Sequence, residues 1–446
     1  MAQLGGTTDR RSFLQLLGLS GLAIGGAASL TACGSDASSE GDTWNKTLAF
    51  VGWDYEPDKI KEFTATWGKT KDVKVDVTII PSLGFSAALQ SRLRGGARAD
   101  VFYNFAYASQ KFVKDKFAAT LEGRSNVDDI LNDMFEASRS RYVDADQRLI
   151  SLPYFSAVDM NVYNKAMLAK AGISAPPSSL QDYYTQSKAV KEAGASETPF
   201  LGFWNKDVLE HYLITYLLLA GVTPFDEGGE PAFADDPATV DVLAWWQTMY
   251  QEGLVQKSAL TDDPGKLITT MSSGKAAFWI VDHYVMKNLV EAKGSASQDL
   301  VMVQPTSGTK TLQFGEVIQM GAKTSGKAAD AAWELMKYYG WKDPNGQFAT
   351  FRAWAKSANL LAPYPGVFAD PEVRAAFGDY MNLPLIQQTF ESGSELVPAR
   401  TRSWYSAFAA QAGDVLQQLI VGKLEPSAAK GELAKAVSSA KSGGGL

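Results

Sequence analysis

Residues 152–194 read LPYFSAVDMNVYNKAMLAKAGISAPPSSLQDYYTQSKAVKEAG and encode strand, turn and helix in succession. The apolar start of this stretch is followed by a further strand pattern in MNVYN. Residues 172–177 supply turn residues, and Ser179 and Asp182 offer a capping box for a helix that ends at Gly194. A strand that leads through a short turn into a helix is the repeating unit of α/β proteins.

Strand and helix patterns also alternate on both sides of this stretch. They predict an α/β layer with a largely parallel sheet, in which sites form beyond the carboxyl ends of the strands. Residues 209–220 are apolar nearly all round and predict a buried helix. The expected strands are 48–53, 73–79, 100–105, 275–281, and 301–305 paired with 314–322, and the expected C-terminal helices are 328–340, 344–355, 371–381 and 403–440.

The composition restricts the possible function classes. A chain of 446 residues with 46% hydrophobic residues can bury a sizeable core and suggests two or three domains. Its net charge of -7 and the lack of a long basic run argue against nucleic-acid binding. One cysteine and two histidines cannot build a Cys/His zinc cluster or a disulfide framework, so we expect no metal and no cofactor. A carboxylate-only calcium site remains open.

The first 32 residues have the layout of an export signal. TDRRSFL at 8–14 is followed by apolar and small residues up to Ala32. Arg10 and Arg11 before Ser12 favour a twin-arginine signal, with an ordinary Sec signal as the alternative.

The single cysteine lies at the end of this segment. Leu30 to Cys33 resemble a bacterial lipobox, in which the cysteine thiol is lipidated and becomes the new N-terminus. The alternatives are an unmodified thiol or a plain transmembrane helix. We therefore expect a signal peptide at 1–32, lipidation at Cys33 and a flexible tether at 33–44.

Several segments together resemble the family-1 extracellular solute-binding proteins, the maltose-binding-protein-like components of ABC sugar importers. The strongest is 152–194, where YNK at 163–165 and the later AGI and PP occur at the family's spacing. LLLAGVTPF, DPATVDVLAWWQTMYQEGLV, SSGKAAFWI and FGEVIQMGAKTSGKAADAAWELMKY follow in the family's order.

The resemblance implies an α/β fold of two discontinuous lobes with a hinge cleft that closes on ligand. Lobe one would be 45–153 plus 305–325, and lobe two 154–304 plus 326–446. It also implies a monomeric, non-catalytic lipoprotein on the outer face of the bacterial cytoplasmic membrane. That lipoprotein would capture a sugar or oligosaccharide and deliver it to ABC permease subunits.

Candidate ligand-binding residues are aromatic and polar side chains near strand ends, because rings suit the apolar faces of a sugar and charged groups suit its hydroxyls. The resemblance supports several of them, including Trp53, Tyr284 and Trp404, by matching family positions. The set is Trp53, Asp54, Phe85, Asn104, Tyr107, Trp204, Asn205, His211, Asp282, Tyr284, Glu316, Arg352, Trp354, Arg402 and Trp404.

Two other functions remain open at this point. The same fold could bind a polyamine, a peptide or a metal chelate, with the rings as cation-π walls. A lipid-anchored glycosidase would need two carboxylates across the scissile bond, and Asp and Glu are plentiful. No nucleophile-elbow or phosphate-loop motif is present, which favours a binder over an enzyme.

Overall fold

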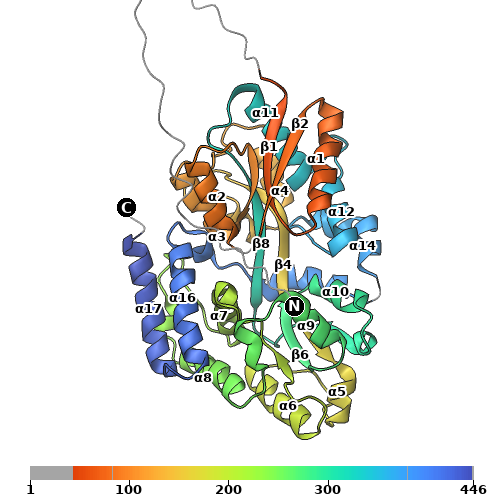
Figure 1. The fold of residues 1–446 in the computed structure, drawn as a ribbon, viewed down its shortest axis with the longest axis vertical. Helices are drawn as coiled ribbons and strands as arrows, with labels where there is room; N and C mark the ends of the chain where they lie inside the picture. Colours follow the sequence, from red (N-terminus) through yellow and green to blue (C-terminus); the bar gives the residue numbers. More distant parts are fainter. Residues whose placement is uncertain (1–43, 83, 379, 444–446) are drawn as a thin grey trace, which may run out of the picture. The chain divides into compact units, whose positions relative to one another are not determined.

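A computed structural model describes residues 44–82, 84–378 and 380–443 (Figure 1). The predicted signal peptide, Cys33 and almost all of the predicted tether fall outside these ranges, so the predictions for them stay predictions. Within the described ranges, no helix combines the length and the apolar character needed to cross a membrane.

The central sheet has the strand order β2-β1-β3-β8-β4-β6-β5, with β7 paired to β4 and β9 paired to β8. β1 pairs in parallel with β2 and β3, but β8 runs antiparallel to β3 and β4. The prediction of a largely parallel sheet was therefore wrong for the middle of the sheet, where β3, β8, β4, β6 and β7 pair antiparallel, whereas β5 with β6 and β9 with β8 are again parallel. The strands are β1 (Thr47–Trp53), β2 (Lys74–Ile80), β3 (Val101–Phe105), β4 (Leu152–Asn164), β5 (Phe200–Leu201), β6 (Phe278–Asp282), β7 (Leu300–Val303), β8 (Thr311–Met320) and β9 (Ser394–Glu395).

Two long strands, β4 and β8, connect the two ends of this sheet, as Figure 1 shows. The first half of β4 pairs with β8, and its second half pairs with β6 and β7. β4 is buried along almost its whole length, which explains its nearly continuous apolar run. The expected strands 301–305 and 314–322 exist as β7 and β8, but each pairs with β4 instead of with the other.

Helices α1 to α4 come after the first strands in the chain and pack around them. Helices α11 and α12, from much later in the chain, pack against the same strands and helices. The ring of Tyr339 in α11 lies 5.6 Å from Phe50, and Trp354 in α12 lies 5.3 Å from Phe63. Segment 326–358 thus packs with the elements of the chain's first third, although it was expected in lobe two. These helices are α1 (Pro57–Lys71), α2 (Phe85–Arg94), α3 (Ala106–Lys114), α4 (Val127–Asp133), η1 (Glu136–Arg141), α11 (Gly326–Gly340), α12 (Ala349–Ala358), α13 (Pro365–Ala369), α14 (Pro371–Phe377) and α15 (Leu383–Gln388).

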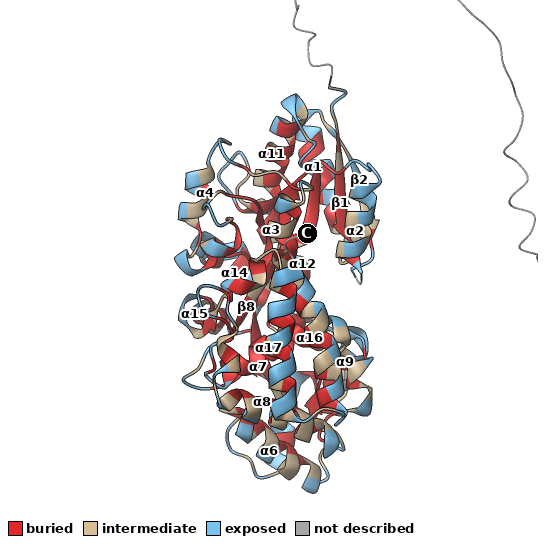
Figure 2. Cartoon of the chain, turned by 90° about the vertical axis from the view of Figure 1, so that its left-hand side faces the viewer, coloured by how far each residue is buried: buried red, intermediate tan, exposed pale blue. Residues whose placement is uncertain are grey.

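The other end of the sheet has its own core around α7, the predicted buried helix. The cartoon coloured by burial shows this interior behind the exposed face of α17 (Figure 2). The expected helix 403–440 is interrupted, because Gly422 adopts a φ of 77° and Pro426 starts a new helix. The helices are α5 (Lys165–Lys170), α6 (Leu180–Glu192), η2 (Lys206–Val208), α7 (Leu209–Leu219), η3 (Ala232–Ala234), α8 (Ala238–Gln251), η4 (Lys257–Leu260), α9 (Pro264–Ser272), α10 (Val285–Glu291), η5 (Ser297–Asp299), the π-helix η6 (Thr389–Gly393), η7 (Pro398–Thr401), α16 (Tyr405–Ile420) and α17 (Pro426–Gly443).

Candidate functional site

A polar cluster around the buried Asp159 forms where β4 changes partners from β8 to β6. Asp159 of β4 lies opposite Asp282 of β6 in the strand register. His211 and Thr215 project from α7 four residues apart, so they share one face of that helix. His211 Nε2 lies 3.0 Å from Asp159 Oδ2, and the Thr215 hydroxyl donates a hydrogen bond of 2.5 Å to the same oxygen. The Tyr284 hydroxyl donates to Asp282 Oδ2 at 2.6 Å.

The cluster contains two carboxyl groups but only one imidazole, so its acidic groups outnumber its basic group. Burial and, after it, the neighbouring Asp159 carboxylate together raise the pKa of Asp282 to about 7. Burial by itself would lower the pKa of His211, but Asp159 outweighs this effect and the pKa is raised. Burial likewise opposes ionisation of Asp159, yet the His211 imidazolium holds the pKa of Asp159 below its usual value. Asp159 and His211 thus form an ion pair, while the raised pKa of Asp282 favours its protonated form below about pH 7.

The same three residues could hold a divalent cation. One ligand atom each from Asp159, His211 and Asp282 lies within 4.8 Å of the others, and imidazole and carboxylate are ligands that Zn²⁺ accepts. Hydrogen bonds among these residues and to Thr215 and Tyr284 already satisfy the same atoms. The cluster therefore needs no metal to explain its geometry.

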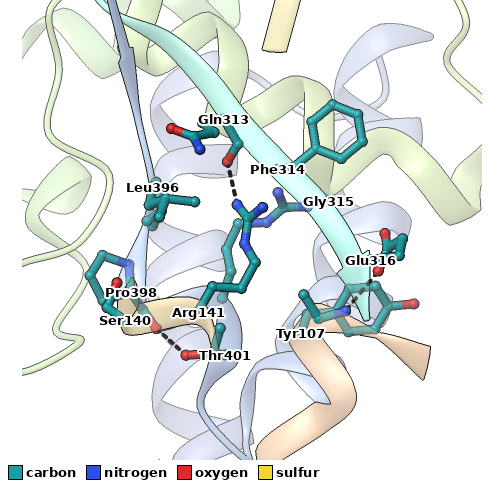
Figure 3. A pocket seen from close by; sticks show the side chains of 13 residues that line it. Tyr107, Ser140, Arg141, Gln313, Phe314, Gly315, Glu316, Leu396, Pro398 and Thr401 are labelled. Carbon is teal, nitrogen blue, oxygen red and sulfur yellow. Dashed lines mark hydrogen bonds between the residues drawn. The ribbon is translucent and has the colours of Figure 1, made fainter. Parts of the chain in front are cut away.

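A small cavity lies against the middle of β8, next to this cluster. It has a volume of about 30 Å³ and is lined by Tyr107 of α3, Arg141 of η1, Arg400 of η7 and β8 residues 313–316. The ring of Phe314 lines the cavity and lies 4.8 Å from the ring of His211, which connects the cavity with the polar cluster. Figure 3 shows how these side chains lie around β8.

Glu316 supplies a carboxyl group to the cavity. Its Oε2 accepts a hydrogen bond of 2.7 Å from the backbone N–H of Ala106, at the start of α3 (Figure 3). Burial raises the pKa of Glu316 to about 7, and Arg400 and Arg141 only partly oppose this. Tyr107 stacks on Phe105 with ring centroids 5.2 Å apart, so one of its faces is already covered.

The two arginines of the cavity have different partners. Arg400 Nε lies 3.1 Å from Oε1 of the buried Glu210, which also accepts a hydrogen bond from the Tyr405 hydroxyl. Arg141 donates through Nη2 to the backbone carbonyl of Gln313 at 2.8 Å. Arg400 is therefore neutralised by a carboxylate, whereas Arg141 bonds a neutral group.

The structure gathers five of the candidate residues at the cavity and the polar cluster. They are Tyr107, His211, Asp282, Tyr284 and Glu316. Phe155, whose ring lies 5.8 Å from Tyr284, and Phe314 add aromatic surface between them. Sequence reasoning did not select Asp159, Arg141 or Arg400. The signal for Asp159 was a charged residue inside an otherwise buried strand, where it must have a partner.

Two further candidates belong to a buried aromatic group next to the site. Trp53 stacks on Phe105 at 5.3 Å and meets Phe85 edge-on at 5.2 Å. Both side chains are buried, Phe85 completely, so in this conformation they pack beneath the site and do not reach a ligand.

The other candidates lie elsewhere in the chain. Buried ones make internal contacts: Asn104 donates to Gln319, and Trp204 donates to Tyr216. Exposed or half-buried ones have local roles, such as Asn205, which caps η2. The remaining members are Asp54, which accepts from the Ser82 N–H; Arg352, paired with Asp370; Trp354, buried in α12; Arg402, half-buried after η7; and Trp404, which lies under Lys441.

Solved structures share this fold. The maltose-bound MalE3 of T. maritima superposes with a TM-score of 0.75 at 15% identity, covering 88% of this chain and 99% of that one. The GacH receptor of Streptomyces glaucescens, solved unliganded and with acarbose, gives 0.73 at 18% identity over 88% and 98%. The cyclic α-maltosyl-1,6-maltose binding protein of Arthrobacter globiformis gives 0.71 at 14% identity over 88% and 98%.

The fold is therefore that of two-lobed periplasmic binding proteins, as expected, with polar and aromatic groups gathered where long strands join the lobes. Residues 53–362 match the model of the bacterial extracellular solute-binding protein family, and the chain belongs to this family. A binding protein of Brucella abortus (strain 2308) is 20% identical over 278 residues, 62% of this chain. The match spans 66% of that relative, just under two thirds of its length.

Proposed function

We propose that this protein is the substrate-binding component of an ABC importer and captures a sugar or oligosaccharide at the site along β4 and β8. The observation that carries the proposal is the convergence of Asp282, Glu316 and Arg141 with the rings of Phe314 and Tyr284. Arg141, Phe314 and Glu316 line the cavity at β8. Ring contacts lead from Phe314 through Phe155 to Tyr284, whose hydroxyl donates to Asp282.

The chemistry of this site suits a polyhydroxyl ligand. Carboxyl and guanidinium groups form charge-assisted hydrogen bonds with hydroxyls, and these are about twice as strong as neutral ones. Rings beside them offer apolar area to the C–H faces of a sugar. The solved relatives named for maltose and acarbose support this ligand class.

Ligand entry would require the lobes to separate. A cavity of about 30 Å³ holds roughly two water molecules, which is far less than a sugar ring needs. Such a motion would bend β4 and β8, since these strands connect the two ends of the sheet. A hinge of this kind is the usual way in which such a cleft opens and closes.

The N-terminal sequence adds a location to the proposal. Export by the twin-arginine signal and lipidation of Cys33 would place the binding domain on the outer face of the cytoplasmic membrane, next to its permease. Radiolabelled palmitate incorporated into the wild-type protein but not into a Cys33→Ser variant would support the anchor. Equal labelling of both proteins would contradict it.

A ligand screen tests the main proposal. Thermal unfolding is measured with mono- and oligosaccharides, polyamines, peptides and metal chelates, and positive ligands are titrated calorimetrically. A bound sugar raises the melting temperature by mass action. Chromatography after incubation must then recover the sugar intact. Stabilisation by polyamines or peptides alone would overturn the sugar assignment, and hydrolysed sugar would overturn the transport role.

A further inference from the structure

The cavity at β8 contains a buried cation without a matching anion. Arg141 is only 6% exposed, and its Nη1 has no hydrogen-bond partner. Among the residues that the structure describes, no carboxylate lies within ion-pair distance of its guanidinium. Burial lowers the pKa of Arg141 and the neighbouring Arg400 adds to this effect, while Tyr142 and Glu316 only partly oppose it. A buried charge in this state is costly unless an anion pairs with it.

The side chain that carries this unpaired donor is one of those that line the cavity. Arg141 lines it and reaches β8 beside Gly315 (Figure 3). A Cβ at Gly315 would lie 3.0 Å from Nη1 and 2.2 Å from the backbone oxygen of Phe155. Glycine at this position therefore permits the close approach of β8 and β4 and keeps the space in front of Nη1 open.

We infer that the solute carries a carboxylate, as in a uronic acid or an oligosaccharide of uronic acids, and that Arg141 binds it. This inference rests on the proposed function and narrows its ligand class. The planar guanidinium fork matches a carboxylate in geometry and charge. The cavity has room for roughly two water molecules, and the two oxygens of a carboxylate can take their places.

Glu316 bears on the choice of anion, because its carboxyl lines the same cavity. The charged and titratable groups that influence it are Arg400, Arg141, His211 and Tyr107. Protonated Glu316 donates a hydrogen bond to an incoming carboxylate, whereas ionised Glu316 repels it. A phosphate group presents three terminal oxygens, more than the roughly two water sites that the cavity offers, so we assign the site to a carboxylate.

Calorimetric titration of matched ligands tests the inference. The probes are glucuronic acid against glucose, galacturonic acid against galactose, and oligogalacturonides against their methyl esters, with glucose 6-phosphate as the other anion. We expect at least one acid to bind about tenfold more tightly than its neutral counterpart, the value of one charge-assisted pair. This preference should increase from pH 8 to pH 6, as Glu316 takes up a proton.

Arg141→Gln should reduce the acid preference to less than about twofold while neutral sugars still bind. Arg139→Gln, in the same helix but not lining the cavity, is the matched control and should keep the preference. If Arg141→Gln does not fold, Arg141→Lys replaces it. The comparison of acids with neutral sugars on the wild-type protein needs no variant and tests the inference in either case.

The outcomes separate the two proposals. Neutral sugars that bind as tightly as their acids, or an acid preference that persists in Arg141→Gln, overturn the carboxylate assignment and leave sugar binding intact. Preference for the phosphate also overturns it. Binding of no sugar in either series overturns the proposed function and the inference together.

Discussion

Asp159 shows how one residue can organise a site from within a buried strand. It accepts a hydrogen bond from Thr215 and pairs with His211, and its charge adds to the burial that raises the pKa of Asp282 across the strand pair. Asp282 therefore changes charge near neutral pH, and burial gives Glu316 a pKa of about 7 as well. Both have hydrogen-bonding capacity left for a ligand, while Asp159 and Glu210 are used within the protein.

The raised pKa of Asp282 predicts that the stability difference between wild type and an Asp282→Asn variant depends on pH. Its folded-state pKa is about 7 against an ordinary 3.8, so the folded state binds the proton more tightly than the unfolded state. The stabilisation of the folded state by protonated Asp282 is therefore present at low pH, and it is lost as pH rises from about 4 to about 7. We expect Asp282→Asn, which is neutral at all pH values, to gain roughly 1 kcal/mol or more relative to wild type between pH 5 and pH 8.

Urea unfolding at these two pH values measures the difference. Asp235→Asn replaces an exposed aspartate and serves as the control, for which no such change is expected. A constant difference between wild type and Asp282→Asn across this range would show that Asp282 ionises normally.

Tyr284 is predicted to contribute aromatic surface to the ligand. Its hydroxyl is held by Asp282 and its ring meets Phe155 edge-on, so the ring is oriented before ligand arrives. We expect Tyr284→Ala to weaken sugar binding by about 1 to 3 kcal/mol, as truncation of a buried aromatic contact does. Tyr184→Ala, which removes a tyrosine bonded to Glu252, should leave affinity unchanged in the same titration. Equal affinities for wild type and Tyr284→Ala would remove this residue from the site.

The sequence located the residues that follow simple rules. Asp282 and Tyr284 come directly after a strand, and His211 and Glu316 are polar residues next to apolar elements. Arg141 and Arg400 lie in short 3-10 helices, where no periodicity marks a side chain that points inward. Whether an aromatic ring lies in the core or at the site was the hardest property to predict. Trp354 and Tyr284 both follow the same sequence rule, and only the neighbours that pack around them place one in the core and the other at the site.

Among the elements, β4 and α5 show how a family motif can have a structural origin. Asn164, the middle residue of the YNK motif, is the N-cap of α5 and accepts hydrogen bonds from the N–H groups of Ala166 and Met167 at 3.0 and 3.1 Å. The motif therefore stops the long strand and starts the next helix. Its position far from Glu316 and Arg141 along the sheet separates it from ligand binding.

We accordingly expect Asn164→Ala to cost about 1 kcal/mol of stability, the usual value of an N-cap. Asn164→Asp keeps the acceptor oxygen, so this variant should retain most of the stability that Asn164→Ala loses. Denaturant unfolding gives the stabilities, and titration of the sugar identified in the screen should show the same affinity for all three proteins. An Asn164→Ala protein as stable as wild type would contradict the capping role.

The path of the chain between elements was harder to predict than the elements themselves. The spacing of apolar residues predicts α7 and β8 correctly, but it carries no information on partners. β8 pairs with β3 and β4, which lie far from it in sequence, and α11 packs back against β1. Such long-range pairing depends on the complementary shapes of whole faces, and these are not visible in a single sequence.

At the scale of the whole binding domain, the size of the cavity predicts a change of conformation. The described structure leaves about 30 Å³ beside β8, while the proposed ligand is a sugar or a longer oligosaccharide. A ligand can bind only if a more open state is populated, and it then favours the state in which both lobes contact it. Because β4 and β8 pass through both ends of the sheet, such a motion bends these strands and moves the lobes apart while each core keeps its own packing.

Small-angle X-ray scattering of one sample before and after ligand addition measures this motion. We expect a larger radius of gyration without ligand, and a decrease on saturation with the sugar found in the screen. A sugar that raises the melting temperature without binding at the site, such as an excluded cosolvent, serves as the control and should leave the scattering unchanged. Identical profiles with and without a tightly bound sugar would mean that the ligand occupies a surface already open in the free protein. The site along β8 would then not be the place of capture, because its cavity cannot admit a sugar without a change in the distance between the lobes.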